Sequence, residues 1–177
     1  ALCLVGSEMC IRDRYKKGSI SKKTIIINNG FKTKEYAIKI AGLINDGFSN
    51  VIPVCDNKEE LYFYDKYVKA EKCNIGIRVA TSEEPNFEFY TSRLGIPNRD
   101  VLSFYEKKIA TNKKFCLKML HFFVDTGIKD SIYYWNELKK AIKLYCELKK
   151  VCPTLKAFNI VGGLPIKHNL GFEYDYT

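Results

Sequence analysis

The chain has 177 residues, of which 46% are hydrophobic and 14% aromatic, and its formal net charge is +9. This length and composition exclude a disordered protein and predict one globular domain. Charged residues interrupt every apolar run before it reaches the roughly 18 residues of a membrane span, so we expect a soluble protein with no membrane association. The lysines are dispersed and no nucleic-acid-binding motif accompanies them, so we expect no nucleic-acid partner.

The first residues differ in character from the rest. The stretch Cys3–Arg14 has an apolar run too short for a signal peptide, and the run ends in charges. It is similar to the translated end of a transposase adapter used in sequencing libraries, joined in frame to an open reading frame. We expect residues 1–14 to be a disordered, adapter-derived tail, and residues 15–177 to be a fragment of a longer protein.

The cysteines beyond this tail indicate a reducing compartment. They show no Cys-x-x-Cys spacing, which argues against a zinc site and against a disulfide framework. Free cysteines in apolar surroundings are typical of cytoplasmic proteins, and we expect this location and no bound metal. The cysteines concerned are Cys55, Cys73, Cys116, Cys146 and Cys152.

From residue 24 onward, short β-branched runs alternate with longer segments of helical period. Strands are predicted at 24–27, 51–55, 75–80, 115–122 and 155–160, and helices at 31–47, 56–72, 98–111 and 130–150. In the last helix, six residues with helical spacing are expected to face the core: Ile132, Trp135, Leu138, Ile142, Tyr145 and Leu148. This order predicts an α/β fold with about five parallel strands, either part of a (β/α)8 barrel of the TIM type or a doubly wound sheet.

Two of these strands end in residues suited to a phosphate. Leu120–Val124 is followed by Asp125, Thr126 and Gly127, and Phe158–Val161 by a pair of glycines. Such strand ends present backbone N–H groups and short hydroxyls to phosphate groups in α/β proteins. The two blocks therefore indicate a phosphorylated cofactor.

Five segments carry a family resemblance. Asn28–Tyr36 resembles an Asn-Gly-Tyr-Lys-x-x-Glu-Tyr turn, Gly76–Arg78 a Gly-x-Arg strand, and Ser92–Ile96 a Ser-Lys-Phe-Gly-Leu segment. Leu120–Phe122 resembles the start of a Leu-His-Phe-His-x-Gly-Ser block, and Val161–Leu164 a glycine triplet. These are motifs of the biosynthetic arginine decarboxylases, which are pyridoxal-phosphate (PLP) enzymes of the alanine racemase and ornithine decarboxylase barrel class.

The resemblance extends over about residues 22–177. It implies a PLP-binding barrel domain and, for the full-length protein, a lyase that converts arginine to agmatine and carbon dioxide in polyamine and spermidine biosynthesis. The implied partners are a small amino-acid substrate and further copies of the same chain in a homo-oligomer.

The resemblance also implies a set of cofactor-binding residues. Arg78 takes the place of an arginine near the cofactor ring, and Phe123 replaces a histidine that stacks on that ring. From the residues alone, Arg78 could equally form a structural ion pair, His121 could be a core histidine and Thr126 a turn residue. The full set is Arg78, His121, Phe123, Thr126, Gly162 and Gly163.

No catalytic residue is expected in this chain. In the family, a lysine on the first strand forms a Schiff base with PLP, and it would lie upstream of residue 15. We therefore expect the fragment itself to be inactive. Phe123, and Val161 in place of the first glycine, keep open a non-catalytic regulatory homologue of the same barrel. A decarboxylase for ornithine or diaminopimelate is a further alternative.

Overall fold

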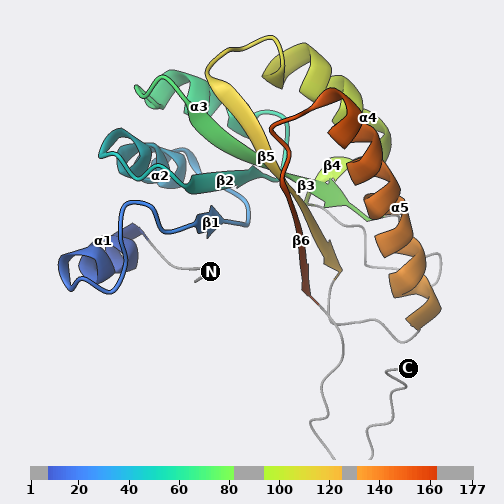
Figure 1. Ribbon diagram of the computed structural model, residues 1–177, viewed down its shortest axis with the longest axis horizontal. Coiled ribbons are helices and arrows are strands. Elements are labelled where there is room, and N and C mark those ends of the chain that lie inside the picture. Colours follow the sequence, from blue (N-terminus) through green and yellow to red (C-terminus); the bar gives the residue numbers. More distant parts are fainter. Residues whose placement is uncertain (1–7, 82–93, 125–130, 163–177) are drawn as a thin grey trace, which may run out of the picture.

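The computed structural model of the chain describes residues 8–81, 94–124 and 131–162 (Figure 1). The strands are β1 (Ile26–Asn28), β2 (Val51–Cys55), β3 (Cys73–Ala80), β4 (Ile96–Pro97), β5 (Phe115–Val124) and β6 (Ala157–Gly162). The helices are α1 (Glu8–Lys16), α2 (Lys34–Asn45), α3 (Glu60–Tyr67), α4 (Asn98–Phe104) and α5 (Ser131–Val151), with a π-helical turn η1 (Tyr105–Ile109) after α4. Within these ranges, no helix has the length and apolar character that a membrane span requires.

The sheet has the strand order of a barrel wall. Its main path is β1-β2-β3-β5-β6, and every pair along it is parallel. Because this order follows the chain without the reversal of a doubly wound sheet, the partial-barrel prediction is confirmed and the doubly wound alternative is wrong. Figure 1 shows the sheet curled, with α2, α3, α4 and α5 on its outer side.

The short strand β4 was not predicted from the sequence. It pairs with the end of β3 outside the main path, with Val79 opposite Ile96. Gly95, which precedes it, has φ +106°, and its N–H donates to the backbone oxygen of Asp56 at 2.8 Å. Two residues are too few to produce a periodic pattern, which is why this strand gives no signal in the sequence.

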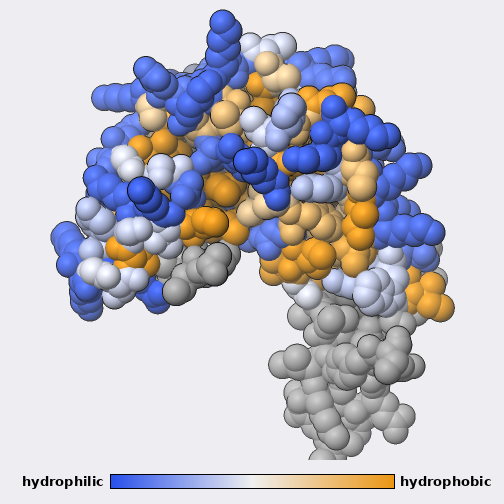
Figure 2. All heavy atoms as spheres, viewed as in Figure 1, coloured by the Kyte–Doolittle hydropathy of each residue, from blue (hydrophilic) through white to orange (hydrophobic). Residues whose placement is uncertain are grey.

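The two faces of the sheet carry different apolar layers. The main core lies between the sheet and the outer helices, and includes Ile75 and Ile77 of β3. The inner face carries a smaller cluster, formed by Ile27, Ile52, Val54, Met119 and the partly buried Ala157. In Figure 2, hydrophilic atoms dominate the outer rim of the visible face, and hydrophobic atoms show nearer its middle.

A register shift divides β5 into two parts. Ile75 of β3 lies opposite Leu117, but the next residue, Gly76, lies opposite Met119. One extra residue of β5, Lys118, is therefore inserted at this point as a β-bulge. Beyond the bulge the register continues regularly, with Arg78 opposite His121.

Helix α5 buries half of the stripe that was predicted to face the core: Leu138 and Leu148 are buried, and Tyr145 packs against the main core. Ile132, Trp135 and Ile142 are 67%, 60% and 44% exposed. The buried side chains are Tyr134, Glu137, Leu138, Ala141, Leu144 and Leu148. Two apolar stripes overlap on this helix, and the edge-to-face contact of Tyr134 with Phe122, with ring centroids 5.9 Å apart, belongs to the stripe that packs on β5.

Residues 8–14, which were expected to belong to a disordered tail, form part of helix α1. Ile11 is 1% exposed and belongs to the main core. Arg12 forms an ion pair with Asp46 at the end of α2, with 2.6 Å between Nη1 and Oδ2. These two contacts explain why residues 8–14 are helical rather than free, and their adapter origin stays a prediction.

Candidate functional site

A row of polar side chains crosses the carboxyl ends of four neighbouring strands. Asp56 follows β2, Arg78 lies in β3, His121 in β5 and Asn159 in β6. The sheet register places Arg78 opposite His121 and His121 opposite Asn159. Asp56, His121 and Asn159 each lie two residues after a member of the inner apolar cluster. Arg78 lies two residues after Gly76, which pairs with Val54 of that cluster. Because side chains alternate along a strand, the row continues the inner face toward the rim.

Arg78 lies between an acid and an aromatic ring. Its Nη1 is 3.8 Å from Oδ1 of Asp56, which is 2% exposed. Its guanidinium carbon lies 4.8 Å from the centroid of the Phe123 ring, within cation–π range. Burial raises the pKa of the Asp56 carboxyl, and the charges of Lys32 and Arg78 act in the opposite direction. Sequence reasoning singled out Arg78 and Phe123, and the structure brings them into contact.

His121 is a buried neutral side chain. It is 2% exposed, and its Nδ1 lies 3.1 Å from Nδ2 of Asn159. Because an amide nitrogen only donates, Nδ1 is the acceptor and the ring proton is on Nε2. Burial lowers the pKa of His121 to about 4, assisted by the positive charges of Arg78 and Lys32. These observations describe a satisfied core histidine next to Arg78, and its role toward a cofactor stays a prediction.

A buried ion pair, which sequence reasoning missed, lies beside this row. The Lys32 side chain is fully buried, and its Nζ donates to the backbone oxygens of Gly30 and Val54. The same Nζ is 3.4 Å from Oε2 of Glu60, whose side chain is 1% exposed. The motif that contains Lys32 offered a signal for the lysine. Nothing in the sequence links it to Glu60, 28 residues further along.

Glu60 connects two strand ends. Its Oε1 accepts the backbone N–H of Lys32 at 3.1 Å, and its Oε2 accepts that of Asp56 at 3.2 Å. Asn57 adds a side-chain donor at 3.3 Å. Burial raises the pKa of Glu60, and Lys32 opposes this effect. One carboxylate therefore joins the segment after β1 to the segment after β2.

Gly162, at the end of β6, occupies a position that only glycine fits. Its φ is +105°, and an added Cβ would lie 2.2 Å from the backbone oxygen of Val124 and 2.9 Å from the Phe123 ring. The backbone can therefore approach a bound group closely at this point. Gly162 thus lies beside Phe123 at the rim. The other two expected phosphate contacts, Thr126 and Gly163, lie outside the described residues.

Gly162→Ala is expected to destabilise the chain by about 1–3 kcal/mol, because it combines an unfavourable φ with a backbone clash. Urea unfolding followed by circular dichroism measures this loss. Gly18→Ala is the matched control, since Gly18 has φ +71° with nothing within 4 Å of an added Cβ. Equal losses in the two variants would mean that the backbone at Gly162 moves freely away from Val124.

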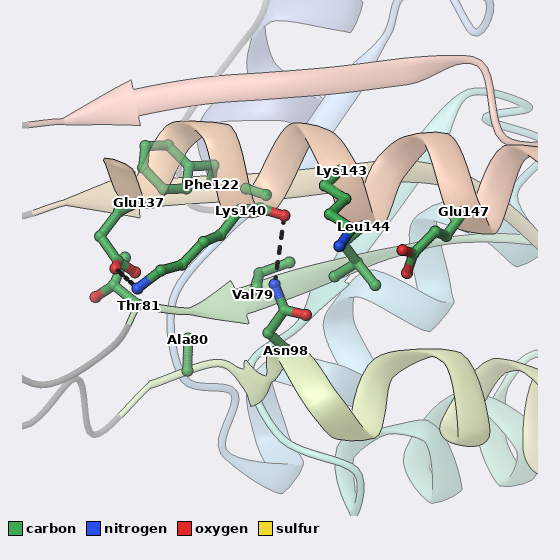
Figure 3. Close-up of a pocket in the computed structure, with 11 residues that line it drawn as sticks. Val79, Ala80, Thr81, Asn98, Phe122, Glu137, Lys140, Lys143, Leu144 and Glu147 are labelled. Carbon is green, nitrogen blue, oxygen red and sulfur yellow. Dashed lines mark hydrogen bonds and ion pairs between the residues drawn. The ribbon is translucent and has the colours of Figure 1, made fainter. Parts of the chain in front are cut away.

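A separate cavity of about 290 Å³ lies on the helix side of the sheet (Figure 3). It is formed by the end of β3 with α4 and α5, and none of the described cofactor-binding candidates, Arg78, His121, Phe123 and Gly162, lines it. Glu137, which is 5% exposed, accepts a 2.5 Å hydrogen bond from Lys140 at its wall. In the described ranges, no group of three or more His, Cys, Asp and Glu side chains is placed to hold a metal ion.

The curled wall of parallel strands with outer helices is part of a (β/α)8 barrel, and solved structures share this fold. Diaminopimelate decarboxylase from Helicobacter pylori, complexed with L-lysine, has TM-score 0.69 and 14% identity, with 98% of this chain and 44% of that chain covered. The arginine decarboxylase of Paramecium bursaria Chlorella virus has TM-score 0.66 and 20% identity, with 89% and 41% covered. SrLDC in complex with PLP and cadaverine has TM-score 0.68 and 19% identity, with 97% and 40% covered.

In sequence, the chain is similar over most of its length to arginine decarboxylases, which confirms the resemblance drawn from the motifs. The biosynthetic arginine decarboxylase of Prochlorococcus marinus is 27% identical over 164 residues, which are 89% of this chain and 24% of that protein. Arginine decarboxylase 2 of Arabidopsis thaliana is 27% identical over 165 residues, covering 88% and 22%. The chain thus spans about a quarter of the length of these relatives. No family model matches it.

Proposed function

We propose that the chain is an internal fragment of a PLP-dependent decarboxylase that converts arginine to agmatine and carbon dioxide in polyamine synthesis. The observation that carries this proposal is the row from Asp56 to Asn159 at the carboxyl ends of the strands, within the region similar to arginine decarboxylases. Active sites of barrel enzymes lie at this end of the strands.

The residues at the rim fit PLP. The guanidinium of Arg78 supplies a fixed positive charge for an anionic oxygen of the cofactor ring, and the Phe123 face offers an apolar contact for the ring itself. Gly162, where an added Cβ would collide with Val124, lets the backbone N–H approach the phosphate, with Thr126 and Gly163 as the expected further donors. When bound, PLP supplies an electron sink for the carbanion left by decarboxylation.

The other members of the row prepare this site. His121 is neutral at pH 7 because its pKa is about 4, so it adds no second positive charge beside Arg78. Asn159 keeps the His121 ring oriented through its 3.1 Å hydrogen bond. Asp56 and Glu60 balance the charges of Arg78 and Lys32.

No lysine in the described residues is available to bind PLP covalently at the row. Lys32, the buried lysine of these ranges, has its Nζ engaged by two backbone oxygens and Glu60. We therefore propose that the 177-residue chain is inactive by itself and that the covalent lysine belongs to the intact reading frame. The buried thiols of Cys55, Cys73 and Cys152 are free, which supports a reducing, cytoplasmic location. We propose a homo-oligomer for the intact protein.

The test is carbon dioxide release by the protein of the intact reading frame, recovered from upstream coding sequence. With PLP added, we expect release from arginine and, in the Arg78→Met variant, a loss of about tenfold or more, because a charge that contacts the cofactor is removed. The 177-residue chain, assayed alongside, is expected to release none. Equal release from ornithine or diaminopimelate would overturn the substrate assignment. PLP binding without any release would favour the regulatory homologue.

A further inference from the structure

We infer that Asp56 is a positioning residue, which holds the guanidinium of Arg78 in place over the Phe123 ring and is itself fixed by Glu60. No step of the proposed reaction requires this role. The inference concerns the chain's own residues and its test needs no cofactor, so its outcome is independent of the proposed function.

The backbone of Asp56 is anchored independently of Arg78. Its N–H donates to Oε2 of Glu60 at 3.2 Å, and its backbone oxygen accepts the N–H of Gly95 at 2.8 Å. Glu60 is held in turn by the fully buried Lys32. The Asp56 carboxylate is therefore presented from a rigid base and does not follow the movements of Arg78.

The carboxylate forms one ion pair among the described residues, and the charge of Lys32 also acts on it. Both of its oxygens are buried without a hydrogen bond in these ranges, and its ion pair is with Arg78 at 3.8 Å. Lys32 and Arg78 carry two positive charges, and Glu60 and Asp56 two negative ones, so the cluster is balanced. Removal of one charge of a buried ion pair takes away the attraction between its two side chains. Without the Asp56 charge, the long side chain of Arg78 loses this attraction, and we expect its guanidinium to shift from its position over the Phe123 ring.

His121 reports the position of Arg78. The charge of Arg78 is one of the causes that lower the pKa of His121 to about 4. If Arg78 stayed in place when the Asp56 charge is removed, the loss of a negative charge could only leave the pKa of His121 unchanged or lower it. A rise in that pKa therefore requires that Arg78 has moved away.

The experiment is an NMR titration of the imidazole signals between pH 3 and 7 in the 177-residue chain, which contains two histidines. A His121→Asn variant assigns the signals. In Asp56→Asn we expect the pKa of His121 to rise by roughly 0.5 to 1 unit, part of the way to the value in Arg78→Met. The double variant is expected to match Arg78→Met. An unchanged or lowered pKa in Asp56→Asn would overturn the inference.

Two further variants make the result specific. Asp100→Asn removes an exposed carboxylate, paired with Lys58 at 2.9 Å, and is expected to leave the pKa of His121 unchanged. Phe123→Leu removes the ring beneath the guanidinium and keeps Asp56. We expect it also to leave that pKa near its original value, whereas a rise would assign the positioning of Arg78 to the ring. Phe123→Leu decides the matter if Asp56→Asn does not fold.

Discussion

Lys32→Met is expected to lower the free energy of unfolding by about 3–5 kcal/mol, because it leaves the Glu60 carboxylate buried and uncompensated. Lys32 is fully buried, and its Nζ also satisfies the backbone oxygens of Gly30 and Val54, which would lose their donor. Urea denaturation of the 177-residue chain at pH 7, followed by circular dichroism, measures the loss. The matched control is Lys39→Met on the exposed face of α2, which we expect to unfold at the same urea concentration as the unaltered chain.

Substitution of Glu60 tests whether the loss of stability in Lys32→Met comes from the broken ion pair. In the double variant Lys32→Met/Glu60→Leu no charge is left uncompensated, so part of the loss should be recovered. The backbone N–H groups of Lys32 and Asp56 would still lack their acceptor, which limits the recovery. If the double variant lost the sum of the two single effects, the pair would not act as a unit.

The stability of the chain is expected to fall as the pH drops from about 6.5 to about 4. His121 has its pKa lowered to about 4 in the folded chain, against 6.5 for the ordinary side chain. Between these values the unfolded chain binds the proton and the folded chain does not, so protonation favours unfolding. The contribution of neutral His121 to the free energy of unfolding is fully present at pH 7, and its complete loss at low pH costs about 3 kcal/mol. Urea unfolding at pH 7 and pH 4.5 measures it.

The matched variant for this prediction is His121→Asn. Asp56 and Glu60 have raised pKa values and act in the opposite direction, since their folded forms take up protons first as the pH falls. Their contribution is common to both chains and cancels in the comparison. The variant should therefore lose less stability than the unaltered chain over this interval. Equal losses would show that His121 titrates with a normal pKa.

The sequence predicted the alternation of strands and helices well, because most of the strands are local, largely apolar runs. Val51–Cys55 was predicted with its observed bounds. Of the site, Arg78, His121 and Phe123 were found as separate motif positions. Their contacts were not predicted, because contacts between strands depend on register. Asp56 was predicted only as the first residue of a helix, and its charge acquires its role from Arg78, which lies on the next strand.

The remaining errors have a common physical origin. The buried face of α5 could not be chosen between two overlapping apolar stripes, since the packing partner, Phe122, lies on another element. Lys32 lies in a recognisable motif but Glu60 does not, and only the fold places the two side chains 3.4 Å apart. Long-range pairing of this kind leaves no periodic signal in one sequence.

The bulge at Lys118 decides which residues of β5 meet the candidate cofactor site. Before it, Leu117 belongs to the main core, whereas Met119, two residues later, belongs to the inner layer. At the bulge, the odd-numbered side chains of β5 change from the outer to the inner face of the sheet, so His121 and Phe123 face inward together with Met119. In a regular strand that kept Lys118, Leu117 and His121 would lie on the same face, and His121 could not face the site while Leu117 packs in the core. The bulge absorbs this one extra residue, so deletion of Lys118 would straighten β5 and leave His121 and Phe123 facing inward.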